Sequence, residues 1–342
     1  MTRSLSLALV GVLALSAAAL AQDLDPQVRR AEAAVKENPG DVDALCGLAS
    51  LYRRAGRLDD ALKTSQRAVA TDEESVQAHH QLALTYKARG ECDKCIPEWE
   101  KVLALDPTFY KAHYNIGVAH HDWAQQLLDE AEKLRAGRRR RQAAEKAGEA
   151  RPHIQKARES WLAALKIKPD HAPSNYNLGV VMHHEGKHDE AIGYYRRAIE
   201  LNPKHVKACV NLGLCLARRN EAVEAVKLWE RAGRLSPGLF EPPYNLGVIY
   251  AQMGRPKDAI VQWENARDVI KPQFDAAEKK KIEPLRTQLA ADLANCYYNI
   301  GVAFEMQKDF KRAQANLKDA VRINPDMDEA WQMLRSIQRR GR

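Results

Sequence analysis

Bulky aliphatic residues followed directly by a small residue recur along the chain at regular distances. The pairs are Leu48-Ala49, Leu82-Ala83, Ile116-Gly117, Leu178-Gly179, Leu212-Gly213, Leu246-Gly247 and Ile300-Gly301. Most successive pairs lie 34 residues apart, and the two longer steps exceed this period by 28 and 20 residues. A fixed period of this length is the sequence signature of a repeat architecture. We therefore expect one small structural unit to recur, with two insertions.

A second small residue and a proline follow in phase within most periods. The small residues are Ala61, Cys95, Ala157, Ala191, Ala225, Ala259 and Ala313. The prolines that close most units are Pro39, Pro107, Pro169, Pro203, Pro237 and Pro325. Small residues let paired helices approach closely and proline ends a helix, so the pattern predicts a chain of short helices.

These residues resemble the tetratricopeptide repeat, a unit of two antiparallel helices with Leu-Gly, Ala, Ala and Pro at fixed positions. Its positions 4, 7, 8 and 11 share one helical face. The resemblance implies an all-α fold, an α-solenoid wound as a right-handed superhelix of about seven repeats, with two helical insertions and a C-terminal capping helix. The repeats begin at Val42, Val76, Tyr110, Ala172, Val206, Phe240 and Ala294. Departures at Glu73, Cys95 and Lys271 leave the helical pattern intact.

The period divides the whole chain into segments. We expect a cleaved signal peptide at 1–21, a lone N-terminal helix at 22–41, repeats 1 and 2 at 42–109, repeat 3 with an inserted helical spur (about 122–151) at 110–171, repeats 4 to 6 at 172–271, an insertion at 272–293, repeat 7 at 294–327, and a capping helix with a basic tail at 328–342.

The first residues resemble a secretory signal. Arg3 precedes an apolar run of about 16 residues that ends with the small-residue site Ala19-Leu20-Ala21. A membrane-spanning helix needs about 20 apolar residues, and no later stretch comes close. We therefore expect a periplasmic or secreted chain without a transmembrane anchor; an uncleaved N-terminal anchor is the alternative.

Both insertions carry basic runs. The first is rich in helix-forming residues and has its midpoint at Gly137, which predicts two arms reversing there and a tip at Arg138, Arg139, Arg140 and Arg141. Pro152 leaves open an arm broken between Gly148 and Pro152. The second insertion carries Lys279, Lys280 and Lys281, with Pro284 suited to the first turn of a helix. Such runs are either a solvated face or a site for an acidic protein, a lipid head group or another polyanion.

Composition narrows the class of protein. Of the 342 residues 45% are hydrophobic, which excludes a disordered tail, and six cysteines are too few for a disulfide scaffold. The formal net charge of +8 mildly favours partners with acidic surfaces.

In the family, the first helices of the repeats line a concave groove, and here an asparagine recurs at the sixth repeat position. The row is Asn115, Asn177, Asn211, Asn245 and Asn299. An amide offers one acceptor and two donors, so it can pair with the backbone of an extended peptide whatever its sequence. The alternative is that these asparagines serve packing between adjacent repeats.

Tyrosines and basic residues extend this peptide-binding groove. The tyrosines at position 5 are Tyr114, Tyr176, Tyr244 and Tyr298, whose rings suit protein contacts. The basic candidates are Lys87, Lys111, Lys207 and Arg218, with Arg53 and Arg54 nearer the N-terminal end. They favour an extended or helical partner segment of acidic character.

Several residues suggest other chemistry. Trp99, Trp161, Trp229 and Trp263 share repeat position 24, where we expect core packing and not an aromatic box for a ligand. His184, Glu185 and His188 match the zinc-protease pattern H-E-x-x-H, but Gly186 should end the first helix between them. His80, His121, His183 and His184 map to the groove, either as ordinary lining or as a loose metal or pH-sensitive site.

The cysteines predict no zinc site of their own. Cys92 and Cys95 form a single C-x-x-C that an oxidising compartment could close into a disulfide. Cys209 and Cys215 are expected to be buried thiols. With no phosphate-binding loop and no G-x-S-x-G motif, we expect no catalytic residues, no metal, no cofactor and no nucleic-acid partner.

The sequence thus predicts a non-enzymatic protein–protein interaction scaffold of the cell envelope. It would bind a peptide segment of a partner through the asparagine row. The alternative is a binder of polyanions or envelope polymers that acts through the basic runs of the two insertions, and salt dependence would distinguish the two.

Overall fold

The computed structural model describes residues 25–340, and within that range every regular element is a helix. The expected signal peptide at 1–21 lies outside the described residues. A helix at residues 25–37 comes first. None of the described helices combines the length and the apolar character that crossing a membrane requires. The prediction of an all-α fold is confirmed.

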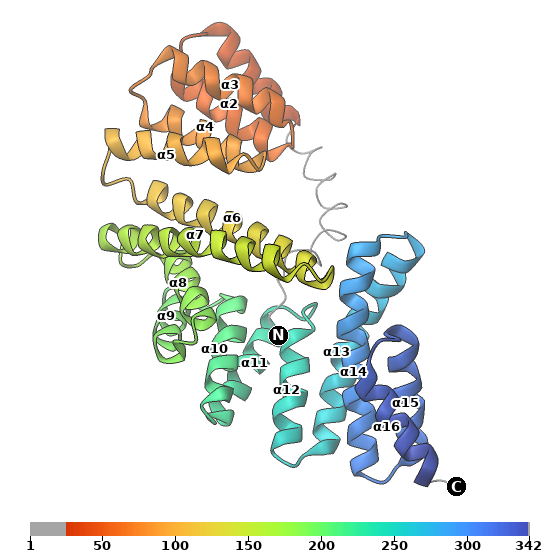
Figure 1. The fold of residues 1–342 in the computed structure, drawn as a ribbon. Coiled ribbons are helices and arrows are strands. Elements are labelled where there is room, and N and C mark those ends of the chain that lie inside the picture. Colours follow the sequence, from red (N-terminus) through yellow and green to blue (C-terminus); the bar gives the residue numbers. More distant parts are fainter. Residues whose placement is uncertain (1–24, 341–342) are drawn as a thin grey trace. The chain divides into compact units, whose positions relative to one another are not determined.

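The chain forms two compact units, one ending at Val181 and one beginning at Met182, and the division falls inside α8 (Ala172–His184). The N-terminal unit contains α2 (Val42–Arg54), α3 (Leu58–Thr71), α4 (Val76–Ala88), α5 (Cys92–Leu105), α6 (Tyr110–Ala136) and α7 (Arg140–Ile167) (Figure 1). The C-terminal unit contains α9 (His188–Leu201), α10 (Val206–Arg218), α11 (Ala222–Leu235), α12 (Glu241–Gln252), α13 (Pro256–Lys279), α14 (Glu283–Met306), α15 (Phe310–Ile323) and α16 (Asp328–Arg340).

Each unit is a stack of helix pairs. Helices that follow one another in the chain pack together, and α2 also contacts α4 while α10 contacts α12. In these two cases the first helices of successive repeats are therefore neighbours. We call the first helix of a repeat its A helix (α2, α4, α6, α8, α10, α12 and α14) and the second its B helix.

Ordinary repeats end the A helix with a residue in the left-handed backbone conformation. Glycine fills that position at Gly56, Gly90, Gly186 and Gly254, with φ between 71° and 79°. A residue without Cβ adopts this conformation at no steric cost, so glycine there stops one helix and lets the next begin.

The tryptophans at repeat position 24 are buried, which confirms the core prediction. In three repeats the indole lies against the glycine of the A helix: Gly117 faces Trp161, Gly213 faces Trp229, and Gly247 faces Trp263. A Cβ at Gly117 or Gly213 would come within 2.5 Å of the indole Nε1. Glycine is thus needed in these Leu-Gly or Ile-Gly pairs because the tryptophan ring occupies the space that a larger side chain would fill.

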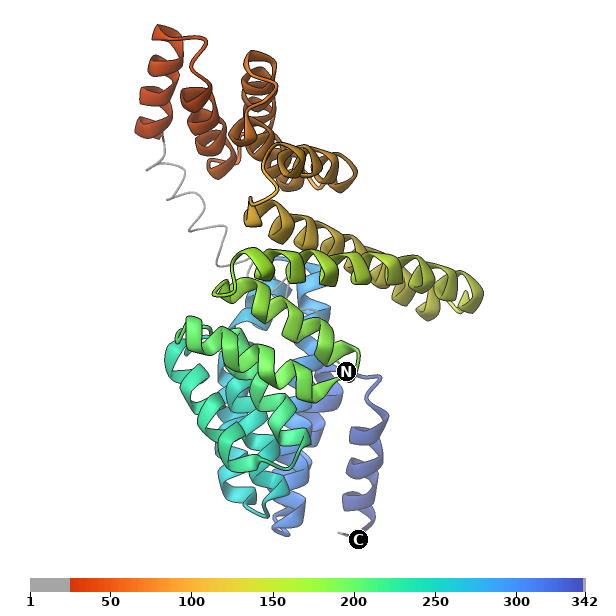
Figure 2. The same ribbon diagram turned by 90° about the vertical axis from the view of Figure 1, so that its left-hand side faces the viewer.

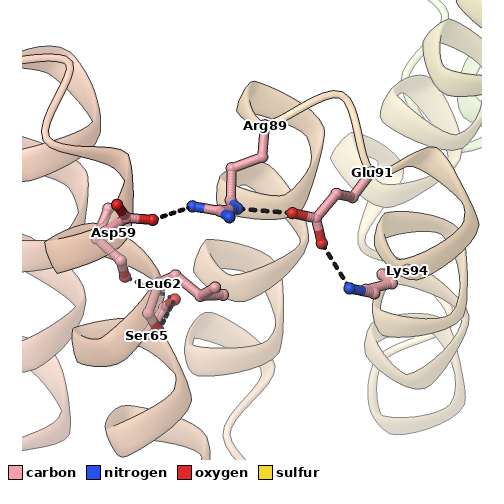
Figure 3. Close-up of polar contacts among 7 residues, drawn as sticks. Asp59, Leu62, Ser65, Arg89, Glu91 and Lys94 are labelled. Atoms are coloured by element: carbon pink, nitrogen blue, oxygen red, sulfur yellow. Dashed lines mark hydrogen bonds and ion pairs between the residues drawn. The ribbon is translucent and has the colours of Figure 1, made fainter.

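Charged residues link the outer ends of successive repeats. In the N-terminal unit Arg89 lies between Asp59 on α3 and Glu91, whose carboxylate also accepts a hydrogen bond from Lys94 at 2.7 Å (Figure 3). The C-terminal unit repeats the arrangement, with the Arg219 guanidinium 2.8 Å from both Asp189 and Glu221. Exposed ion pairs of this kind are each worth about 0–1 kcal/mol, so they orient the repeats more than they stabilise them.

Two hairpins are longer than the rest. α6 and α7 run side by side along their length, and α7 continues unbroken through Pro152 (Figure 2). α13 likewise continues through Pro272, and α14 has Pro284 in its first turn. The first long hairpin lies within repeat 3, and the second joins repeat 6 to repeat 7.

The reversal of the first hairpin differs in detail from the expectation. Gly137 has φ −76°, and the left-handed residue is Arg138 with φ 60°. The Arg139 N–H donates to the Leu134 carbonyl at 2.8 Å, which closes the last turn of α6. Because this closure places the left-handed residue one position after the helix cap, the conformation falls on an arginine.

Candidate protein-binding face

The predicted groove residues lie on the A helices, and each unit carries its own part of this A-helix face. Asn115 lies on α6 and Asn177 on α8, while α10, α12 and α14 carry Asn211, Asn245 and Asn299. These five side chains are half-buried, as are Tyr114, Tyr176, Tyr244 and Tyr298. Side chains in this state contact the protein interior and remain within reach of a ligand.

Tyrosine hydroxyls accept hydrogen bonds from three of the asparagines. Asn299 donates to Tyr244 at 3.2 Å, and Asn177 is hydrogen-bonded to Tyr114. Both pairs join position 5 of one repeat to position 6 of the next. Burial raises the pKa of Tyr244, so the phenol stays protonated at neutral pH. The asparagine row therefore contributes to packing between repeats.

Asn211 uses a different partner, the hydroxyl of the buried Tyr195 on the preceding B helix, at 3.4 Å. Asn245 follows a repeat that has Val210 at position 5, and valine offers no hydroxyl group. Asn115 follows a repeat with His80 at that position. Asn115 and Asn245 are thus the members of the row whose amides are least committed to the tyrosine network.

The N-terminal unit holds basic residues around a buried histidine. His80 accepts a hydrogen bond from the Trp99 indole at 3.2 Å. Burial, and then the nearby Lys111 and Arg53, lower the pKa of His80 to about 4, so the ring is neutral at pH 7. Lys111 is exposed and Lys87 is half-buried.

Arg53 is half-buried among neutral hydrogen-bond partners. Its guanidinium bonds only neutral groups, Ser50 Oγ at 3.3 Å and Gln81 Oε1 at 3.4 Å. Its Nε is buried without a hydrogen-bond partner, and burial lowers the pKa of the guanidinium. Within residues 25–340, no carboxylate lies in ion-pair distance of Arg53. A half-buried guanidinium without a counter-charge is unfavourable, and an acidic ligand would relieve that cost.

On the C-terminal unit the predicted basic residues Lys207 and Arg218 are exposed. Burial raises the pKa of Glu241 at the start of α12, and the positive charge of Lys207 partly offsets this rise. One Glu241 oxygen, Oε2, is buried without a partner in the described structure. This part of the face is therefore of mixed charge.

The basic tips lie in solvent at the ends of the long hairpins. Arg138, Arg139, Arg140 and Arg141 are exposed, as are Lys279, Lys280 and Lys281. Arg141 pairs with Glu145 one turn further along α7, at 3.0 Å. For the other three arginines the described part of the chain supplies no ion-pair partner.

Cys92 and Cys95 lie in the first turn of α5 as free thiols. Cys95 is buried with its Sγ 3.4 Å from the Cys92 carbonyl oxygen, and Cys92 is half-buried. A second, side-chain hydrogen bond from the Cys95 thiol to the Cys92 sulfur lowers the pKa of the Cys92 thiol to about 7. Their disulfide remains a prediction.

The H-E-x-x-H residues do not lie on one helix. α8 ends at His184, Gly186 has φ 77°, and α9 begins at His188. The turn instead places His188 near His183, with ring centroids 5.3 Å apart, and Cys215 of α10 joins them. The H-E-x-x-H pattern singles out His188 but pairs it with His184. The grouping with His183 and Cys215 could not be predicted, because only the fold shows that α10 lies against this turn.

The remaining predicted histidines have ordinary surroundings. His121 packs beside the Trp161 ring at 5.8 Å. His120, which the sequence analysis did not select, has its Nδ1 3.0 Å from Nδ1 of His153 on the facing helix. The two histidines are 33 residues apart on either side of the insertion, so no sequence motif predicted that they would meet.

Stacked helix pairs with exposed A-helix residues define a class of protein: helical-repeat scaffolds that bind other proteins. Three segments match sequence profiles of the tetratricopeptide repeat, at residues 172–205, 28–75 and 294–327. The chain is a tetratricopeptide-repeat protein. Such proteins bind protein partners and peptides and are in general non-enzymatic.

Solved structures agree on the fold. The C-terminal part of a repeat-containing protein from Cytophaga hutchinsonii is 15% identical, with a TM-score of 0.58, covering 83% of this chain and 97% of that one. PilF of Pseudomonas aeruginosa is 18% identical, with a TM-score of 0.52, covering 67% of this chain and 91% of that one. A comparison with curated proteins gave no match. At these identities the likeness shows the fold alone.

Proposed function

We propose that this protein is a non-enzymatic scaffold of the cell envelope that holds an acidic segment of a partner protein on the A-helix face of its N-terminal unit. The observation that carries the proposal is Arg53, a half-buried cation with an unpartnered Nε and neutral neighbours. Lys111, whose charge acts on His80 together with that of Arg53, adds positive charge nearby. A carboxylate docked there would complete a charge-assisted hydrogen bond that the described part of the chain does not supply.

The asparagines would act as the sequence-independent part of the contact. An amide that gives one N–H to a tyrosine still has a second N–H and its oxygen for a peptide backbone. Packing and peptide capture are therefore compatible roles for one side chain. Because Asn115, on the N-terminal unit, has no tyrosine at position 5 of the preceding repeat, it separates the two roles experimentally.

The test uses fluorescence anisotropy with a labelled, extended peptide rich in Asp and Glu, and with the same peptide carrying Asn and Gln instead. We expect the acidic peptide to bind, and Arg53→Gln to weaken binding about 10- to 100-fold, as for truncation of a buried charge pair. Lys63→Gln, on the outer B helix α3, removes the same charge and should leave affinity unchanged. Equal binding of both peptides, or equal loss in both variants, would refute the proposal.

A second assay examines the asparagine row. Asn115→Ala should weaken capture of the acidic peptide without changing the unfolding midpoint. Asn177→Ala removes the hydrogen bond to Tyr114 and should lower the midpoint instead. If Asn115→Ala leaves the affinity for the acidic peptide unchanged, peptide binding by the amide at that position is refuted.

The second candidate function, polyanion binding, rests on the exposed cations at the two hairpin tips. Binding to a polyanion releases counterions, so its affinity falls steeply as salt rises. We expect a sulfated polysaccharide to bind at low salt and to lose affinity when Arg138, Arg139 and Arg140 become Gln. Peptide capture at Arg53 should be insensitive to those tip substitutions, which separates the two functions.

A further inference from the structure

Three potential metal ligands meet where repeat 4 packs on repeat 5. His183 lies in the last turn of α8, His188 begins α9, and Cys215 lies on α10. One ligand atom from each residue lies within 4.8 Å of the other two. Cys215 Sγ and His183 Nδ1 lie 3.1 Å apart. Residues five and 32 positions apart are thus brought together by the turn and by the repeat stack.

The turn between α8 and α9 builds this cluster. Gly186 takes the left-handed conformation, and the Lys187 N–H then donates to the Met182 carbonyl at 2.9 Å. That bond folds the start of α9 back over the end of α8. His188 therefore lies beside His183, with the two rings nearly perpendicular.

The cluster contains an unsatisfied polar atom. His188 Nδ1 is buried and has no hydrogen-bond partner among the described residues. A buried ring nitrogen without a partner is unfavourable unless something else binds it.

Two imidazoles and a thiolate are a donor set for zinc-class dications. Zinc takes nitrogen at about 2.0 Å and sulfur at about 2.3 Å in tetrahedral geometry, which places ligand atoms about 3.3–3.8 Å apart. His183 Nδ1 and Cys215 Sγ, at 3.1 Å, are slightly closer than that separation, and small side-chain rotations would bring all three ligand atoms into it. Burial raises the pKa of the Cys215 thiol to about 11, so a metal would have to displace its proton into solvent.

The charged neighbour of the cluster is Arg218, one turn further along α10. It lowers the pKa of both His183 and Cys215. Arg218 therefore stabilises a thiolate while it opposes a free dication. A dication bound to a thiolate carries one charge less, so the two effects partly cancel.

We propose that His183, His188 and Cys215 form a site for one zinc-class dication that joins repeat 4 to repeat 5. Three protein ligands leave a fourth position for water or for a side chain of a bound partner. The site does not depend on the peptide-binding face proposed above. It also differs from the H-E-x-x-H reading, which would use His184 in place of His183.

The test titrates the full chain, freed of metal with a chelator and kept reduced, with Co²⁺ and then Zn²⁺. We expect one Co²⁺ per chain with a thiolate-to-cobalt charge-transfer band in the near ultraviolet, displaced by Zn²⁺. Since even outer-shell changes cost about 10- to 100-fold in metal affinity, His183→Ala, His188→Ala and Cys215→Ser should each weaken binding at least about tenfold. Zn²⁺ should also raise the unfolding temperature of the wild type and not of Cys215→Ser.

Three variants serve as controls. Cys209→Ser, at a second buried thiol on the same helix, His184→Ala, and the double change of Cys92 and Cys95 to Ser should all keep the band and the stoichiometry. Circular dichroism of the metal-free His188→Ala chain shows whether a loss arises from misfolding. Absence of a charge-transfer band in the wild type, its retention in Cys215→Ser, or its loss in His184→Ala but not His183→Ala would overturn the proposal.

Discussion

The two long hairpins differ in what fills the space between their helices. Beyond the repeat core, the buried residues of the α6/α7 hairpin are mostly alanine, at Ala124, Ala131, Ala143 and Ala150, with Leu127 as the one large aliphatic among them. The α13/α14 hairpin buries Ile270, Phe274, Leu289 and Leu293. Both tips are basic and both hairpins contain an internal proline.

From this difference we expect the buried apolar area, and not the length or the charge, to set the stability of each extension. Alanine lets two helices approach closely but removes little apolar surface from water, and burial of apolar area supplies most of the stabilisation. The α13/α14 extension joins the large core of the C-terminal unit. The α6/α7 extension has a small cluster of its own around Leu127.

Matched leucine substitutions give the largest expected effect. Leu289→Ala should cost about 4 kcal/mol and Leu127→Ala about 2 kcal/mol, the upper and lower parts of the range for buried leucine. Hydrogen exchange, read separately over α6/α7 and α13/α14, measures the local loss. Equal costs at the two sites would contradict the comparison.

Acid should loosen one hairpin and not the other. Burial, and then His153 and Lys156, lower the pKa of His120 to about 4, and burial lowers the pKa of His153. A histidine with a depressed pKa takes up its proton more readily in the open state, so the closed hairpin loses stability as the pH falls from about 6.5 to about 4. The α13/α14 hairpin contains no histidine.

Hydrogen exchange at pH 7 and pH 5, corrected for intrinsic rates, checks this difference. Protection near His120 should fall at pH 5, while protection over α13/α14 should change little. Changing His120 and His153 together to Gln should remove the pH dependence at the α6/α7 base. A similar acid loss in both hairpins would show that the histidine pair is not its cause.

The tips should show the smallest effect, and the two hairpins should respond alike. Arg138 and Lys281 have φ of 60° and 54°, which costs an L-residue about 1–2 kcal/mol. Glycine avoids this strain but loses more entropy on folding, so Arg138→Gly and Lys281→Gly should each stabilise by about 0.5–1 kcal/mol. Arg139→Gly, at φ −88°, should not stabilise; if it does, backbone strain is not the reason.

Local patterns in the sequence were sufficient to predict the repeat unit and the residues of its core. The Leu-Gly pairs and the tryptophans at position 24 predict each other's packing, because glycine on the A helix leaves the space that the indole of the same repeat fills. The left-handed glycine at Gly186 likewise excluded a continuous helix through the H-E-x-x-H residues. Each of these features depends on neighbours within one repeat.

The period, the helical class and the core positions could be predicted from the sequence, because they follow from the spacing of residues along single helices. Three other features appear only in the folded chain: Asn299 bonds Tyr244, Arg53 has no counter-charge among the described residues, and Cys215 lies beside His183 and His188. Those contacts depend on how one helix pair packs against the next. The spacing of residues within a single repeat does not determine that packing.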